Sequence, residues 1–261
     1  MLFAIDIGNS NIHVGFFEDD KLVHTFRLGT DKNRTSDEYV LLLKSISEFN
    51  SYKMSFFDSA IIGSVVPAVT PILQRAVEAD LNVTPIIVGP GVKTGFPIKI
   101  DDPSELGADL AANTAGAIYK VGFPSIVIDF GTATTVSVID ETKAYIGGAI
   151  MPGIQMSLDA LQNTGLLPGM AADKAVPLIG KTTKDCMSAG VIRGQAFSVQ
   201  SLIDSYNKTF LNNKCINTVI SGGFAPAILP YLPDTVEYVP HLTLEGLNAI
   251  YKHNKVNSRR K

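Results

Sequence analysis

Phe3-Ala4-Ile5-Asp6-Ile7-Gly8 is the stretch that decides the fold, because the same pattern returns as Ile126-Val127-Ile128-Asp129-Phe130-Gly131. Each copy is an apolar run that ends in Asp-x-Gly. A second apolar, β-prone run follows each copy, at residues 12–17 and 134–139. The residues between the runs tolerate the backbone angles of tight turns. The sequence therefore predicts two β-hairpins, each with an aspartate at the end of its first strand.

The repeated pattern has a chemical meaning. A strand delivers the carboxylate to its end, glycine lets phosphate oxygens approach the backbone, and the amides and hydroxyls of the turn donate hydrogen bonds. A single copy is better explained as an ordinary turn, since Asp and Gly are common turn residues. Two copies favour a pair of phosphate-binding loops. The sequence has no GxxxxGK[ST] loop and no GxGxxG turn after a strand, which counts against the rival nucleotide folds.

Strand and helix patterns alternate along the remaining chain, which predicts an α/β fold. Thr35-Ser36-Asp37-Glu38 forms a capping box before a helix. Ser104 is a candidate cap for a helix over about residues 106–119, and a short strand is expected at residues 143–146. A later helix carries an apolar stripe that most often packs on its own domain's sheet, with a subunit interface as the second interpretation: Ala189, Ile192, Ala196, Val199, Ile203 and Tyr206.

The composition is that of a globular chain that can form two lobes. The chain has 261 residues, of which 46% are hydrophobic and 18% charged. We expect an N-terminal lobe over residues 1–118 and a C-terminal lobe over residues 119–261. The net charge of -3 provides no overall positive field for nucleic acid or anionic membrane. No apolar run reaches the roughly 20 residues that cross a bilayer, and Asp6 interrupts a signal-peptide pattern, so a cytoplasmic enzyme is expected.

Cysteine, histidine and serine show no pattern typical of a metal site or a hydrolase. Cys186 and Cys215 have no CxxC or Cys/His pairing, so both are expected to be buried free thiols. The four histidines lack ligand spacing, and only His13 lies in a loop of interest. No serine stands in a GxSxG setting, which leaves acyl transfer unsupported.

The paired hairpins resemble those of the actin, Hsp70 and sugar-kinase superfamily. That resemblance implies two ribonuclease H-like lobes, each a mixed β-sheet flanked by helices, with the active-site cleft between them. Within the superfamily the chain resembles the type III pantothenate kinase family nearly from end to end. Each motif alone is weak, but their order and spacing are specific together: Asp6–Ser10, Gly63–Pro67, Gly89–Gly95, Glu105–Asp109, Asp129–Thr135, Gly147–Gly153, Ser221–Gly223 and Leu242–Leu247.

The resemblance implies ATP-dependent phosphorylation of pantothenate to 4′-phosphopantothenate, the first step of coenzyme A synthesis. It also implies which residues bind ATP: Asp6, Ile7, Gly8, Asn9, Ser10, Asn11, Ile12, His13, Gly131 and Thr132. A glycine pair that meets the adenosine has two candidates, Gly147-Gly148 and Ser221-Gly222-Gly223.

The resemblance further implies the substrate and cation sites. Gly107, Ala108 and Asp109 would line the pantothenate pocket, with Asp109 as the catalytic base. Asp129 would help to hold a monovalent cation, K⁺ or NH₄⁺. Thr183 would reach pantothenate across a homodimer interface, although locally it also fits a helix N-cap.

The residues themselves support part of this chemistry. Asp109 is expected in the first turn of a helix, where the macrodipole favours the ionised form and a carboxylate can accept a proton. From its position alone, Asp109 is better explained as an ordinary residue at the start of a helix. The Glu105–Asp109 motif favours the catalytic base instead. Asp6 and Asp129 are carboxylates beside a polyanion, which requires cations between them, so we infer Mg²⁺ with ATP.

Two positions depart from the family pattern. Leu110 stands where many members have an arginine after the catalytic aspartate, and Ile100 stands where a tyrosine is frequent. Three hypotheses therefore stay open. The first is a pantothenate kinase. The second is another enzyme of the superfamily that phosphorylates a different small alcohol or hydrolyses ATP or polyphosphate, and the third is a nucleotide-responsive regulatory binding protein.

Overall fold

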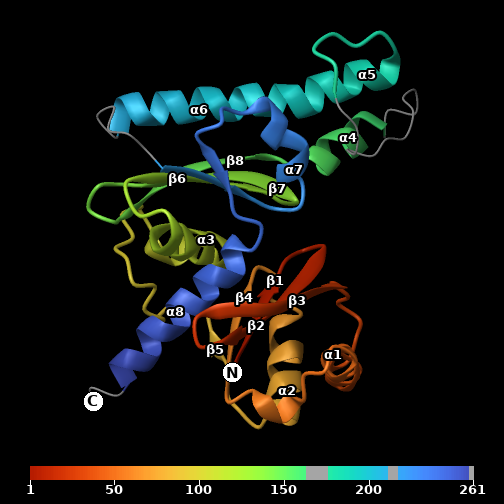
Figure 1. Ribbon diagram of the computed structural model, residues 1–261, viewed down its shortest axis with the longest axis vertical. Coiled ribbons are helices and arrows are strands. Elements are labelled where there is room, and N and C mark those ends of the chain that lie inside the picture. Colours follow the sequence, from red (N-terminus) through yellow and green to blue (C-terminus); the bar gives the residue numbers. More distant parts are fainter. Residues whose placement is uncertain (163–175, 211–216, 259–261) are drawn as a thin grey trace. The chain divides into compact units, whose positions relative to one another are not determined.

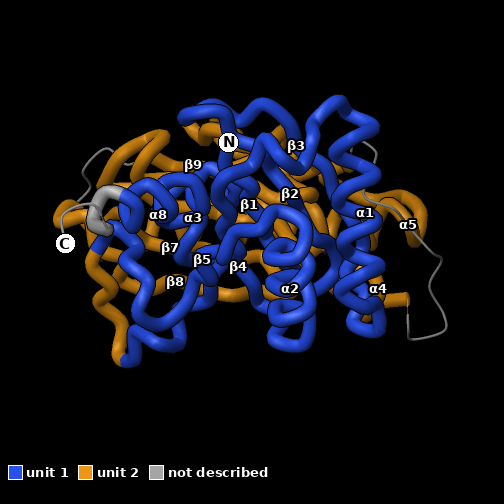
Figure 2. Tube along the Cα trace, turned by 90° about the horizontal axis from the view of Figure 1, so that it is seen from below, with its two compact units in different colours: residues 1–96, 102–116, 243–261 blue, residues 97–101, 117–242 orange. Residues whose placement is uncertain are grey.

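The computed structural model describes residues 1–162, 176–210 and 217–258, and the chain forms two compact units (Figures 1 and 2). Unit 1 comprises residues 1–96, 102–116 and 243–261, and unit 2 comprises residues 97–101 and 117–242. The expected division at residue 118 differs from these units. It assigns residues 243–261 to the C-terminal lobe, whereas they belong to unit 1. The domain boundary itself stays a prediction.

Unit 1 is built on a five-stranded sheet of order β3-β2-β1-β4-β5. The central strand β1 pairs antiparallel with β2 and parallel with β4. The carboxyl ends of β1 and β4 therefore lie side by side, and the first predicted hairpin is confirmed as β1 and β2. The strands are β1 (Leu2–Ile7), β2 (Asn11–Glu18), β3 (Lys21–Gly29), β4 (Ser59–Ser64) and β5 (Ile86–Ile87).

One face of this sheet forms the main core of unit 1. Every second residue of β1, Phe3, Ile5 and Ile7, packs with residues of α1 (Ser36–Phe49) and α2 (Thr70–Leu81). The predicted capping box starts α1, because the Thr35 hydroxyl accepts from the Glu38 amide while the Thr35 amide donates to the Glu38 carboxylate. Two 3₁₀ turns, η1 (Met54–Phe56) and η2 (Pro103–Glu105), connect these elements.

Unit 2 repeats the topology of unit 1 on a sheet of order β10-β9-β6-β7-β8. The central strand β6 pairs antiparallel with β7 and parallel with β9, as β1 pairs with β2 and β4. The repeat thus extends from the hairpin, where the sequence match ends, to all five strands. They are β6 (Ser125–Phe130), β7 (Ala133–Ile139), β8 (Tyr145–Pro152), β9 (Asn217–Ser221) and β10 (Val236–Tyr238).

Helices cover the apolar face of the second sheet. Ile126, Ile128 and Phe130 of β6 pack with the predicted stripe of the long helix, which is therefore confirmed as a core contact. Figure 1 shows α6 lying along this sheet. The helical elements are α4 (Ile154–Gln162), α5 (Thr183–Ser188), a π-helical turn η3 (Ala189–Arg193), α6 (Gly194–Phe210), α7 (Ala225–Ile228) and the 3₁₀ turn η4 (Leu229–Tyr231).

Two expected boundaries are wrong. The helix expected from residue 106 with a Ser104 cap is α3 (Ala108–Lys120), because Ser104 lies in η2, where its amide donates to the Asp102 carboxylate instead. The strand expected at residues 143–146 is β8, which continues to Pro152 through two glycines, since its ladder with β7 supplies the hydrogen bonds. Within the described ranges, no helix combines the length and apolar character that crossing a membrane requires.

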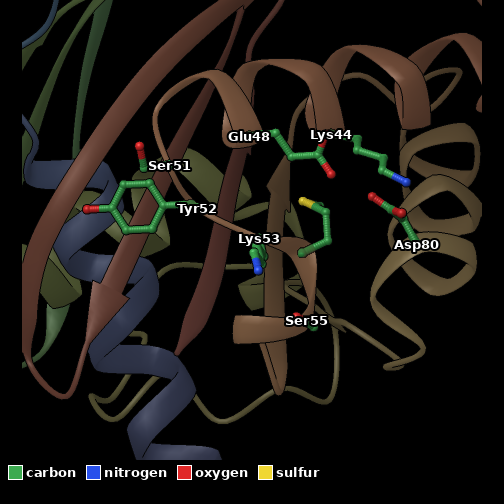
Figure 3. Close-up of a pocket in the computed structure, with 8 residues that line it drawn as sticks. Lys44, Glu48, Ser51, Tyr52, Lys53, Ser55 and Asp80 are labelled. Atoms are coloured by element: carbon green, nitrogen blue, oxygen red, sulfur yellow. The ribbon is translucent and has the colours of Figure 1, made fainter.

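A cavity of about 660 Å³ lies in unit 1 between η1 and the ends of α1 and α2 (Figure 3). The predicted site residues do not line it. Asp80, in the last turn of α2, faces Lys44 and Glu48 of α1 across the cavity (Figure 3). Burial raises the pKa of Asp80, the Lys44 ammonium lowers it and the Glu48 carboxylate raises it further. Among the described residues, Asp80 Oδ2 is a buried oxygen without a hydrogen-bond partner.

Asp80→Asn is expected to stabilise the protein at pH 7. A carboxyl whose folded-state pKa is raised loses stability as the pH rises from its unfolded pKa through its folded pKa, and a negative charge at a helix C-terminus opposes the macrodipole. The expected gain in the free energy of unfolding is about 0.5 kcal/mol, the size of a helix-dipole effect. Urea unfolding of both proteins, repeated at falling pH, should show the gain shrinking as Asp80 becomes protonated.

Asp37→Asn is the matched control, because Asp37 lies in the first turn of α1, where the macrodipole favours a negative charge. This variant should be slightly less stable than the parent protein at pH 7. A loss of stability in Asp80→Asn at the same pH would show instead that attraction to Lys44 outweighs burial.

Candidate active site

The first predicted phosphate loop is a turn that unit 1 holds at three points. The Gly8 amide donates to the Asn11 carbonyl at 3.0 Å and closes the turn. Thr30, directly after β3, donates from its hydroxyl to the Gly8 carbonyl at 2.7 Å and from its amide to the Ser10 carbonyl at 3.1 Å. The shape of the loop is therefore set before any ligand binds, which favours recognition of a fixed group such as a phosphate.

The eight residues predicted for this loop differ in what they expose. Ile7 and Ile12 are fully buried, so only their backbone groups can contact a ligand. Asn9, Ser10 and Asn11 form the exposed tip. Asp6 and His13 are direct partners in the antiparallel ladder and therefore lie on the same face of the sheet.

The segment after β4 lies next to this loop. Asp6 is the register partner of Gly63, and the Val65 amide donates to the Ile7 carbonyl at 3.0 Å. The Ser64 hydroxyl accepts from the Val66 amide at 3.0 Å and from the Thr70 hydroxyl at 2.7 Å. These bonds tie the segment to the start of α2. The Ser64 hydroxyl therefore stabilises the turn between β4 and α2.

The predicted base stands at the beginning of α3, also in unit 1. A Cβ built on Gly107 would lie 2.7 Å from Asp109 Oδ1 and 3.9 Å from the Val65 side chain, so the carboxylate folds back over Gly107. Burial raises the pKa of Asp109, and hydrogen bonds from the Leu110 and Asp109 amides lower it. Ala108 is buried. Unit 1 thus brings a partly buried carboxylate to the segment that neighbours the Asp6 loop.

The second predicted loop in unit 2 is tighter than the first. The Gly131 amide donates to the Ala133 carbonyl at 3.1 Å, whereas the bond in the first loop spans one more residue. Thr132 is exposed at the tip, and Asp129 is partly buried at the end of β6. Both loops therefore follow the same plan: an aspartate, a closing glycine amide and an exposed polar tip.

Two further glycines pack against the second loop. A Cβ on Gly153 would overlap the carbonyl oxygen of Thr132 and lie 2.7 Å from that of Gly131. Gly222 has a φ of +95°, and a Cβ there would lie 2.5 Å from both Asp129 Oδ1 and the Phe130 carbonyl oxygen. The Phe224 amide donates to that carbonyl at 3.1 Å. Side chains are excluded at both positions, so the backbone approaches the loop closely.

The position of Gly222 distinguishes the two candidate glycine pairs. Ser221 is the register partner of Asp129, so the Ser221-Gly222-Gly223 segment continues from the carboxyl end of β6 and β9. Gly147 and Gly148 lie within the β8 ladder, opposite Val138 and Ser137 of β7. Within unit 2, the pair beside the second loop is therefore Gly222 and Gly223.

Two supporting residues were missed in the sequence. Gln195 of α6 accepts from the Thr134 hydroxyl at 3.0 Å and donates to the Pro152 carbonyl at 2.6 Å, which joins the starts of β7 and α6 to the end of β8. Thr30 supports the first loop in a comparable way. Neither residue lies in a recognisable sequence motif. The support that each gives to its loop is visible only in the paired strands of the structure.

Thr183 and the two cysteines need separate comment. Thr183 begins α5 in unit 2 and is exposed, but the N-cap is Thr182, whose hydroxyl accepts from the Asp185 amide. The N-cap interpretation of Thr183 is therefore wrong by one residue. Cys186 is exposed rather than buried, because α5 turns it outward. Cys215 lies outside the described residues.

The cation chemistry of the site rests on oxygen atoms. In the described part of the chain, no three His, Cys, Asp or Glu side chains gather as a metal cluster. Asp129 Oδ1 and the Phe130 carbonyl oxygen both lie 2.5 Å from the position that a Cβ on Gly222 would take, so the two oxygen atoms lie on the same side of the second loop. A carboxylate with a carbonyl suits a hard cation such as K⁺, and Mg²⁺ needs few protein ligands when phosphates supply the others. The residues present therefore fit both cations.

The amino-acid sequence matches a known family over most of its length. The family model described as type III pantothenate kinase matches residues 2–205. The chain is 39% identical to a type III pantothenate kinase of Exiguobacterium sp. (strain ATCC BAA-1283 / AT1b), over 98% of this chain and all of that protein. It is 38% identical to the type III pantothenate kinase of Moorella thermoacetica, over 97% of this chain and all of that protein.

Solved structures confirm the fold. A conserved Baf family protein from Campylobacter jejuni has a TM-score of 0.63 at 20% identity, over 97% of this chain and 99% of that one. The activator of the 2-hydroxyisocaproyl-CoA dehydratase from Clostridium difficile, with bound ADPNP, has a TM-score of 0.54 at 10% identity, over 100% of this chain and 98% of that one. A hexokinase of the ROK type from Thermus thermophilus has a TM-score of 0.52 at 11% identity, over 98% of this chain and 99% of that one.

These structures share the two-lobe fold of the actin-like ATPases, with a mixed five-stranded sheet in each lobe, as expected from the paired hairpins. Likeness at such low identity shows the fold alone, whereas the family model and the full-length relatives also show the function. The chain therefore belongs to the type III pantothenate kinase family, whose members phosphorylate pantothenate with ATP in the first step of coenzyme A synthesis.

Proposed function

We propose that this chain transfers the γ-phosphoryl group of ATP to the hydroxyl of pantothenate, with Asp109 as the base. The observation that carries this assignment is local to unit 1. The Asp109 carboxylate folds over Gly107 beside Val65, and Val65 is hydrogen-bonded to the strand that ends in the Asp6 loop. A phosphate loop and a candidate base thus share one end of one sheet.

The loops of both units contact ATP in this proposal. In the first loop, Gly8, Asn9, Ser10 and Asn11 offer amides and polar side chains, and Ile7 and Ile12 contribute only backbone. Asp6 and His13 flank the turn on one face. In the second loop, Gly131 and the exposed Thr132 have the corresponding position. Phosphoryl transfer depends chiefly on such positioning and on neutralised charge.

Asp109 has the properties of a base for this reaction. Gly107 and Ala108 shape the backbone around it, and together they form the proposed pantothenate pocket. Burial raises the pKa of Asp109, which makes the ionised carboxylate a better proton acceptor than an ordinary aspartate. Asp109 would take the proton of the attacking hydroxyl as its oxygen bonds to the γ-phosphorus and the bond from that phosphorus to the bridging oxygen of ADP breaks.

Cations complete the proposed site. Asp129, through Oδ1, would help to hold K⁺ or NH₄⁺ where the Phe130 carbonyl oxygen and Gly222 meet. Asp6 would act through the water shell of Mg²⁺ that accompanies ATP. These cations neutralise the charge of the phosphate oxygens. Because ATP is the phosphoryl donor, our proposal also places this activity in the cytoplasm.

A second candidate function rests on Leu110 and Ile100. Leu110 follows the proposed base with an apolar side chain where an arginine would meet an anion. Ile100 lies in the segment paired with Tyr145 of β8, near Gly147, where a tyrosine is frequent in the family. Each of the two positions has an apolar side chain where the family frequently has a polar one. The second candidate is therefore a kinase of the same mechanism that prefers a neutral alcohol.

A coupled ADP-release assay separates these functions. Pantothenate and pantetheine carry the same hydroxyl, but only pantothenate carries a carboxylate, so the pair tests the acceptor directly. We expect turnover with pantothenate that increases when K⁺ or NH₄⁺ is present. Faster turnover with pantetheine or another neutral alcohol supports the second candidate. ATP or polyphosphate hydrolysis without an alcohol, or ATP binding without turnover, would contradict both and favour a hydrolase or a nucleotide-responsive regulator.

Asp109→Asn tests the base. Removal of general base catalysis typically costs ~10²- to 10⁴-fold in rate, so kcat should fall by at least about 100-fold. The affinity for ATP, measured by calorimetry, should change little, because ATP contacts are proposed for the two loops. Asp102→Asn is the control, since Asp102 is an exposed aspartate in the same segment. Turnover at the parental rate in Asp109→Asn would remove Asp109 as the base.

We also propose a homodimer in which Thr183 serves the site of the partner subunit. Unit 2 exposes large apolar side chains shortly before Thr183 in the sequence and on two further elements, and a dimer could cover them. They are Ile150 on the edge strand β8, Leu178 and Ile179 before α5, and Phe197 on α6. Thr183 itself is exposed in the first turn of α5.

Mixed dimers of Asp109→Asn and Thr183→Val test the shared site. If each site combines Asp109 of one subunit with Thr183 of the other, a mixed dimer has one site with both changes and one intact site. Co-expressed, differently tagged subunits should therefore recover about half of the parental kcat per dimer. Light scattering checks the dimer. Mixed dimers with only the mean activity of the two parents would contradict a site shared between subunits.

A further inference from the structure

The second face of the unit 1 sheet has a row of small residues. Phe3, Ile5 and Ile7 of β1 point to the main core, so Ala4 and Asp6 point to the opposite face. The register partner of Ala4 on β2 is Gly15, and that of Asp6 on β4 is Gly63. A narrow strip of small residues, Gly15, Ala4 and Gly63, therefore crosses the three strands and ends beside the first phosphate loop. Larger partners, Ile61 opposite Ala4 and His13 opposite Asp6, lie on the same face.

Helix α8 (Leu242–Ser258) fills this strip with two leucines. A Cβ built on Gly15 would lie 2.8 Å from Leu244 Cδ1, and one on Gly63 would lie 3.0 Å from Leu247 Cδ2. Both leucines are fully buried. Residues three apart share a helix face, so this face of α8 lies flat on the strands that carry the Asp6 loop.

Another face of α8 contacts α3, the helix that begins with the proposed base. A Cβ on Gly246 would overlap the carbonyl oxygen of Ala112 and lie 3.0 Å from the Gly116 amide nitrogen. Thr243, one turn earlier, donates from its hydroxyl to Asn113 Oδ1 at 2.8 Å, and Asn113 is only 1% exposed. Both views show α8 and α3 side by side (Figures 1 and 2).

Backbone contact between the helices fixes the position of α3. Ala112 lies about one turn after Asp109, and a helix transmits a displacement of one turn to the next because its hydrogen bonds are continuous. The flexible end of a leucine can move away from a new methyl group, whereas the Ala112 carbonyl can move only with its helix. The contact at Gly246 therefore sets the distance between the strands of unit 1 and the start of α3, where Asp109 lies.

We infer that Gly246 is a positioning residue for Asp109: by leaving no side chain between α8 and α3, it holds the start of α3 at the correct distance from the Asp6 loop. Thr243 supports the same contact through Asn113. This inference rests on the proposed role of Asp109 as the base, and it assigns to α8 a part in the reaction although α8 contains none of the proposed site residues.

Gly246→Ala tests the inference. The new methyl group displaces α3 by on the order of 1 Å, and a misplacement of that size costs up to ~10²-fold in rate, so we expect kcat to fall 10- to 100-fold. KM for ATP should stay within about twofold, because the contact between α8 and the strands is untouched. Kinetics are normalised to folded protein by circular dichroism and ATP titration, since a purely structural role would lower the folded fraction and leave kcat per folded molecule unchanged.

Two further variants make the result interpretable. Gly194→Ala is the matched control, because Gly194 is also a helical glycine but has open space around it, and kcat should be unchanged. Thr243→Val keeps the side-chain shape and removes the donor to Asn113, so kcat should fall severalfold at unchanged KM for ATP. If Gly246→Ala does not fold, the kcat of Thr243→Val tests the positioning role instead.

The outcome separates this inference from the proposed function. Parental kcat in folded Gly246→Ala, or in Thr243→Val where the first variant is unfolded, overturns the positioning role even if Asp109→Asn is inactive. Parental kcat in Asp109→Asn overturns the base itself, whatever Gly246→Ala does. A fall in kcat accompanied by an equal rise in KM for ATP also overturns the inference, because it locates the effect of Gly246 in the phosphate loop.

Discussion

Parallel pairing of the central strand is the constraint on which the rest of each unit depends. In unit 1, β1 and β4 end together with Asp6 opposite Gly63, and in unit 2, β6 and β9 end together with Asp129 opposite Ser221. A carboxylate at the end of a buried strand is costly unless ligand or backbone groups accompany it. The residue after the neighbouring strand brings its backbone close to each strand end: the Val65 amide donates to the Ile7 carbonyl, and Gly222 lies against Asp129.

Because side chains alternate along each strand, the two faces of the first sheet have different roles. One face carries Phe3, Ile5 and Ile7 into a buried apolar core with α1 and α2. The other face is thin, because Gly15 and Gly63 have no side chains, and α8 lies close to the strands. The stable face and the chemically important face are thus separated by the two-residue period of a strand.

Periodicity made much of this predictable, and tertiary contacts explain what was missed. The hairpins, the capping box at Thr35 and the stripe on α6 are local signals, and the structure confirms them. The start of α3 could not be read locally, because Asp102 competes with Ser104 as a cap. That Gly222 lies beside the second loop, while Gly147 lies within the β8 ladder, depends on pairing between strands distant in sequence. Gln195 lies in none of the motifs. Gly246 lies in the Leu242–Leu247 motif, but its contact with α3 could not be predicted because it depends on the atoms that face it.

Leu110 shows how one substitution redistributes the electrostatics of such a site. A positive charge in the first turn of α3 would lower the pKa of Asp109 and give an anionic substrate a partner. With leucine there, burial is the largest influence on the pKa of Asp109, and only two backbone amides oppose it. The carboxylate becomes more basic while the surroundings become less attractive to an anion. Proton abstraction and the attraction for an anionic acceptor are therefore expected to change in opposite directions.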